Sequence, residues 1–126
     1  MGLNIGVVHW AFPPVTGGVE MHLLTICPEM VRQGGDVSLL CGSVAGQPAT
    51  EEVKSVTVER RDGMVVDRIA GAREAGEDVY ERSRAMFDAF LDDHDIEVLQ
   101  AHNLHLDFFD LSRALQDACN ERAITY

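Results

Sequence analysis

The sequence has no long apolar run and little positive charge. No stretch approaches the length needed to span a membrane, and the first apolar run, 3–8, lacks a basic flank and is too short for a signal peptide. We therefore expect no transmembrane segment and a cytoplasmic location. The formal net charge of -11 repels phosphate backbones and anionic lipid heads, so we expect binding neither to nucleic acid nor to a membrane surface.

Cysteine is also scarce. The chain has three cysteines, Cys27, Cys41 and Cys119, and no CxxC pair. An odd number at these spacings argues against the disulfide framework of a small secreted protein. Each cysteine is expected to be a small core residue.

The chain has 126 residues, of which 46% are hydrophobic, enough for the core of one domain over 1–126. Apolar runs typical of strands alternate with amphipathic stretches typical of helices. Strands are expected at 3–8, 37–41, 56–59 and 96–99 and from 123 onward, and helices at 19–33, 79–91 and 108–120. The segment 44–55 is expected to be an irregular loop, and 64–76 fits a short strand as well as a helix.

Strands that alternate with helices favour right-handed crossovers and a parallel sheet covered on both faces. The expected fold is therefore α/β, a Rossmann-like three-layer domain with a mostly parallel sheet. In such sheets ligands bind beyond the carboxyl ends of the strands. The loops after the strands at 3–8 and 96–99 are the places to look for a site.

Two glycines, Gly17 and Gly18, stand at the start of the first expected helix. Without side chains they would let a ligand reach backbone amides, where the helix dipole favours phosphate. Glu20 in the first turn could contact a ligand hydroxyl. The alternative is a tight turn followed by a glutamate that stabilises the helix.

Two common phosphate-binding motifs are missing from this loop. No GxGxxG follows the first strand, which argues against a dinucleotide fingerprint. The loop also lacks the lysine that a Walker motif needs. The N-terminal domain of family 4 glycosyltransferases, which have the GT-B fold, opens with the pattern F-x-P-x-x-G-G-x-E. This loop resembles that pattern at Phe12, Pro14, Gly17, Gly18 and Glu20.

The resemblance continues along the chain. Residues 95–105 look like the fourth strand of that family and the histidine-bearing loop after it. One departure is Asp36 after Gly35, where the family usually has a histidine after the glycine.

The resemblance implies the N-terminal half of a GT-B fold, which mostly holds the acceptor and faces a C-terminal donor-binding domain that is absent here. The implied function is hexosyl transfer from a nucleotide sugar to an unknown acceptor with retention of configuration, without a metal or other cofactor. This chain alone is not expected to catalyse transfer, and no catalytic residue is assigned. The implied substrate-binding residues are Gly17 and Gly18 towards the donor diphosphate, Glu20, and on the acceptor side His102, Asn103 and His105.

Other interpretations remain open at this stage. His9, His102 and His105 could converge at one sheet edge as metal ligands, but no further donor is evident, which favours hydrogen-bonding histidines. The chain could also be a stand-alone binding or interaction module without catalytic activity. A third alternative is a nucleotide-binding Rossmann relative unrelated to sugar transfer.

Overall fold

The computed structural model describes residues 2–9, 17–61, 78–102 and 109–126. Within them, one five-stranded sheet has the strand order β3-β4-β2-β1-β5. The strands are β1 (Asn4–His9), β2 (Asp36–Gly42), β3 (Thr50–Val53), β4 (Val56–Arg61) and β5 (Val98–His102), and the helices are α1 (Gly18–Arg32), α3 (Asp78–Asp93) and α4 (Phe109–Glu121).

Most strand pairs in the sheet are parallel. β1 lies between β2 and β5 and is parallel to both, and β2 is parallel to β4. The register sets His9, the last residue of β1, directly opposite His102, the last residue of β5. The carboxyl ends of these two strands therefore meet at one edge of the sheet.

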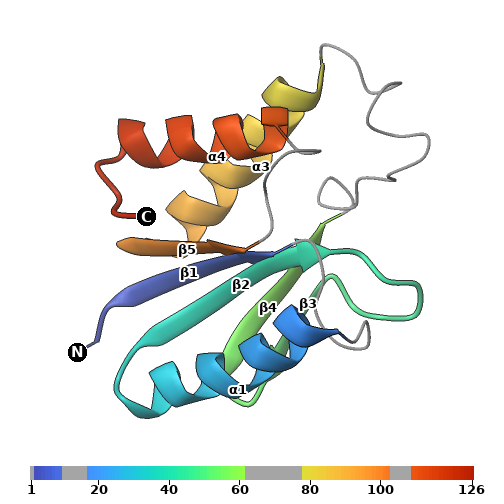
Figure 1. The fold of residues 1–126 in the computed structure, drawn as a ribbon, viewed down its shortest axis with the longest axis vertical. Helices are drawn as coiled ribbons and strands as arrows, with labels where there is room; N and C mark the ends of the chain where they lie inside the picture. Colours follow the sequence, from blue (N-terminus) through green and yellow to red (C-terminus); the bar gives the residue numbers. More distant parts are fainter. Residues whose placement is uncertain (1, 10–16, 62–77, 103–108) are drawn as a thin grey trace.

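Helices cover both faces of the sheet, α1 on one side and α3 with α4 on the other (Figure 1). Successive strand residues point to opposite faces, so Val7 packs on the α1 side and Val8 on the α3 and α4 side. Leu39 and Leu40 alternate in the same way. The expected Rossmann-like three-layer domain with a mostly parallel sheet is confirmed.

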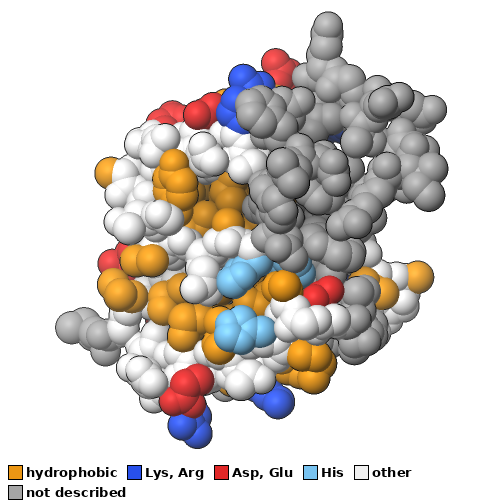
Figure 2. All heavy atoms as spheres, in the orientation of Figure 1, with side chains coloured by type: hydrophobic (Ala, Val, Ile, Leu, Met, Phe, Trp, Pro, Cys, Tyr) orange, Lys and Arg blue, Asp and Glu red, His pale blue; other side chains and the backbone are white. Residues whose placement is uncertain are grey.

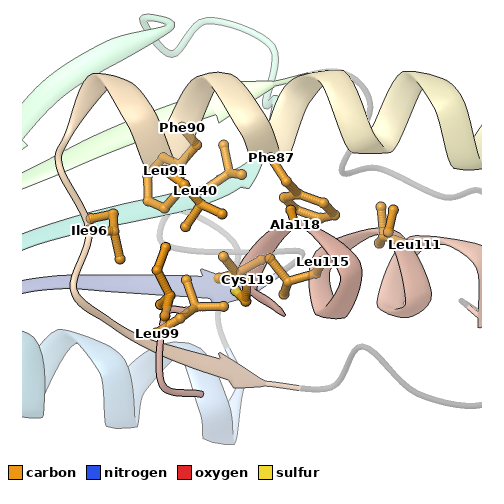
Figure 3. Close-up of a cluster of buried hydrophobic side chains, with 13 residues drawn as sticks. Leu40, Phe87, Phe90, Leu91, Ile96, Leu99, Leu111, Leu115, Ala118 and Cys119 are labelled. Carbon is orange, nitrogen blue, oxygen red and sulfur yellow. The ribbon is translucent and has the colours of Figure 1, made fainter. Parts of the chain in front are cut away.

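The larger hydrophobic cluster lies between the sheet and the helix pair (Figure 3). Phe87 and Phe90 of α3 are almost completely buried there. Leu111 and Leu115 of α4 face them, at the spacing of one helical turn. Truncating either phenylalanine to alanine would cost about 3–5 kcal/mol at such a site, so this cluster is a major source of stability.

Helix α1 ends where the sequence predicts. The amide of Gly34 donates to the carbonyl of Val31 and that of Gly35 to Met30, the hydrogen-bond pattern of a Schellman cap. Gly34 has a φ of +100°, which glycine adopts without steric cost. The chain then turns directly into β2.

The expected irregular loop at 44–55 is wrong in its second half. Residues Thr50–Val53 form β3, which is antiparallel to β4. Lys54 and Ser55 connect the two strands with φ values of 49° and 68°. Two successive residues with positive φ make a type I′ hairpin turn, and a lysine-serine pair is an unusual sequence for it.

The other expected elements are found with small shifts of their ends. The strand expected from 123 onward is present only as a parallel bridge between Val98 and Thr125. The segment 64–76, whose sequence fits a short strand as well as a helix, lies outside the described residues.

All three cysteines are buried and free. Burial raises the pKa of Cys27 to about 11, that of Cys41 to about 12 and that of Cys119 to about 11. The thiols are therefore protonated at neutral pH and act as small core residues. Among the described helices, none is long and apolar enough to cross a membrane.

Candidate functional site

Three polar side chains meet at the carboxyl edge of the sheet. His9 ends β1, His102 ends β5, and Glu20 lies in the first turn of α1, which begins at the same edge. We call His9, Glu20 and His102 the polar cluster. In Figure 2, histidine side chains gather near the middle of one face, among hydrophobic side chains.

His9 is the buried centre of the polar cluster, with no exposed surface. Its Nδ1 lies 3.1 Å from the carbonyl oxygen of His102. Its Nε2 lies 3.7 Å from Oε2 of Glu20, whose residue is 6% exposed. The rings of His9 and His102 meet edge to face, with centroids 6.4 Å apart.

His102 is half-buried and favours the neutral imidazole. Its pKa is lowered, first by burial and then by the charges of His9 and His22. His22 is itself exposed on α1. The Nε2 atom of His102 is buried and has no hydrogen-bond partner among the described residues. A neutral imidazole can donate from one nitrogen and accept at the other, which suits a hydroxyl ligand.

The start of α1 is open beside the cluster. Gly17 is its N-cap residue, with an extended backbone (φ -171°, ψ -173°) and no capping hydrogen bond from a described side chain. Gly17 and Gly18 are both exposed, and a Cβ added to Gly18 would meet no atom of the described residues within 4 Å. A Cβ on Gly17 would lie 3.2 Å from Oε2 of Glu20. The Glu20 carboxylate thus occupies the Gly17 side, and the open space is at Gly18.

Backbone conformation does not explain why positions 17 and 18 are glycines. Neither has a positive φ, so other residues could adopt these conformations. Glycine is also a poor helix former compared with alanine. What glycine does supply at Gly18 is access to backbone amides that have no partner inside the helix.

The structure brings together four of the six residues predicted from the sequence: Gly17, Gly18, Glu20 and His102. Asn103 and His105 lie outside the described residues. His9 was considered only as a metal ligand, and its central place was missed. The signal available was a histidine at the carboxyl end of an otherwise apolar strand.

No group of three histidine, cysteine, aspartate or glutamate side chains in the described ranges is arranged to hold a metal ion. In the polar cluster, Nδ1 of His9 contacts the His102 carbonyl and Nε2 faces Glu20, while His105, the third histidine considered as a metal ligand, lies outside the described residues.

Comparison with known proteins identifies the fold. No family model matches the chain, and no curated protein matches its sequence. Among solved structures, sucrose-phosphate synthase from Thermosynechococcus elongatus is similar, with a TM-score of 0.68 over 98% of this chain. The fold is that of a GT-B domain. Sequence identity is 10%, and the chain spans 31% of the length of that protein, so the likeness concerns the GT-B fold alone.

Proposed function

We propose that this chain is the acceptor-side domain of a nucleotide-sugar-dependent glycosyltransferase that transfers a hexosyl group with retention. The observation that carries the proposal is the open start of α1 at Gly18, beside the polar cluster, at the carboxyl edge of a GT-B sheet. The match to 31% of sucrose-phosphate synthase supports a role as one part of a larger enzyme.

The donor diphosphate would approach the Gly18 side of the helix start. Amides in the first turn of a helix have no intrahelical partner, and the helix dipole favours an anion there. The negative charge of Glu20 lies beside Gly17 and faces His9, so it opposes a phosphate at Gly17 more than at Gly18. Glu20 could accept a hydrogen bond from a sugar hydroxyl through Oε1.

The acceptor would lie against the end of β5. His102 offers a neutral imidazole there, and neutral histidine can bind a hydroxyl without introducing charge. Asn103 and His105 follow it in the chain and belong to the same proposed acceptor side.

The proposal is tested by calorimetric titration of the purified chain with UDP, GDP and UDP-sugars. We expect weak binding that Gly18→Val reduces by about tenfold or more, because a side chain there blocks hydrogen bonds to a charged ligand. Thr25→Val is the matched control: Thr25 is exposed on the same helix, and its hydroxyl donates to the carbonyl of Met21 in the preceding turn. Equal affinity in the wild type and Gly18→Val would contradict a phosphate-facing glycine loop.

Gly18→Ala separates stability from binding. Its Cβ has open space and the backbone needs no positive φ, so we expect the free energy of unfolding to rise by about 0.4–1 kcal/mol. Urea denaturation measures this change. A stabilised Gly18→Ala together with a Gly18→Val that no longer binds would show that glycine is retained for the ligand and not for the helix.

A further inference from the structure

The polar cluster connects the first two elements of the chain with a strand that is far away in the sequence. His9 belongs to β1, Glu20 to α1 and His102 to β5. The bond from His9 to the His102 carbonyl spans 93 positions of the chain. This bond joins β1 to the end of β5, where the acceptor would bind. The contact of His9 with Glu20 joins β1 to the start of α1, where the donor would bind.

The geometry fixes where the His9 ring carries a proton. A carbonyl oxygen only accepts hydrogen bonds, so the 3.1 Å contact with the His102 carbonyl requires the hydrogen on Nδ1. The opposite nitrogen, Nε2, faces Glu20 at 3.7 Å, within ion-pair range. A fully buried ring held in this way cannot turn without losing its bond to β5.

We infer that His9 is a positioning residue for the ligand site, and that Glu20 acts on the site through His9. His9 binds the last carbonyl of β5 and so fixes the point from which the segment after β5 departs. Oε2 of Glu20 lies 3.7 Å from the opposite nitrogen of the ring and so places the first turn of α1 against His9. The inference rests on the proposed function for its ligand, but the bonding pattern can be tested without one.

The first measurement is the tautomer of His9 in the purified wild-type chain, from ¹⁵N chemical shifts of its ring nitrogens. We expect the hydrogen on Nδ1. Glu20→Gln, which keeps the shape but removes the charge, should shift the Nε2 resonance and leave the Nδ1 hydrogen in place. A neutral ring with its hydrogen on Nε2 alone would overturn the inference, whatever the ligand.

Two variants test the positioning role. His9→Phe keeps a ring of similar shape without nitrogen, and His9→Asn keeps an N–H donor close to the position of Nδ1. We expect amide hydrogen exchange in β5 to become about tenfold faster in His9→Phe, as for the loss of one hydrogen bond, and to recover largely in His9→Asn. His94→Phe is the matched control, because His94 also faces a glutamate, Glu59, but lies outside the polar cluster. Unchanged exchange in His9→Phe would overturn the inference.

Titration with UDP, GDP and UDP-sugars then separates the two proposals. If both hold, His9→Phe lowers the affinity about tenfold and His9→Asn restores most of it. If the wild type binds no nucleotide, the proposed function fails, while the tautomer and exchange results still decide the role of His9. If the wild type binds and His9→Phe binds equally well, the positioning role fails and the proposed function stands. Should His9→Phe fail to fold, the wild-type tautomer and His9→Asn remain decisive.

Discussion

At the residue scale, burial and two neighbouring imidazoles all lower the pKa of His102. Burial disfavours the charged ring, and the charges of His9 and His22 add to this effect. The pKa of His102 therefore lies below its ordinary value of 6.5. In the pH range of most enzymes this histidine is a neutral hydrogen-bonding group.

We predict that NMR titration finds the pKa of His102 below 6.5 and that His22→Gln raises it part of the way back. The recovery should be partial because burial, the largest cause, is unchanged. His94→Gln, which alters a histidine outside the polar cluster, should leave the His102 titration unchanged. A pKa of 6.5 or higher in the wild type would contradict the burial of this ring.

The lowered pKa of His102 also determines whether its contribution to the free energy of unfolding rises or falls with pH. Between the lowered pKa in the folded state and 6.5 in the unfolded state, the unfolded chain binds more protons. The contribution of His102 is therefore complete above 6.5 and is lost as the pH falls towards the folded-state pKa. Replacing His102 by glutamine should flatten the pH dependence of the unfolding free energy in this window.

At the element scale, the hairpin between β3 and β4 is held in a costly conformation. Lys54 and Ser55 both have positive φ, which costs a residue with a Cβ roughly 1–2 kcal/mol. The cost is tolerated because β4 is tied to β2 on its other side and because Val56 and Val58 are buried under α1. The turn is thus determined by packing and not by its own sequence.

We predict that Lys54→Asn/Ser55→Gly, which installs the preferred sequence of a type I′ turn, raises the free energy of unfolding by about 1–2 kcal/mol. Ser55→Ala is the control, since alanine keeps the Cβ and gains nothing. Urea denaturation compares the variants. The hypothesis of a strained turn would be rejected if the double variant and Ser55→Ala had the same stability as the wild type.

This turn also shows why part of the fold could not be predicted. The apolar runs 3–8 and 37–41 and the glycines at 34–35 carry local signals, and the elements they predicted are present. The pair Lys54-Ser55 carries no turn signal, and Thr50–Val53 contains one apolar residue, so tertiary pairing alone creates β3. The polar cluster is an intermediate case. Both strands were predicted, but the strand expected at 96–99 ends at His102, and the bond between His9 and His102 depends on the register of β1 and β5.

At the scale of the whole molecule, the described residues form one sheet with helices on both faces, and the carboxyl ends of β1 and β5 meet at one edge of it. The alternation seen at Val7 and Val8 divides the core between α1 on one face and the helix pair on the other. The polar cluster lies at the carboxyl edge, where the α1 layer and the layer of α3 and α4 both end. Under the proposed function, this domain would contact a ligand at this edge from one side, and a second domain would supply the other side of a closed site.

The last prediction concerns catalysis. Transfer requires donor, acceptor and charge-stabilising groups to be held together, and positioning alone can supply roughly 7–11 kcal/mol of barrier reduction. The 126-residue chain corresponds to 31% of sucrose-phosphate synthase, so we expect no sustained release of UDP or GDP from nucleotide sugars in the presence of monosaccharide and sugar-phosphate acceptors. An intact GT-B enzyme serves as the assay control, and circular dichroism shows that the chain is folded. Binding without turnover fits a domain that provides one side of a cleft between two domains. Sustained turnover by the wild type that is abolished in Gly18→Val would mean that this domain holds a complete site.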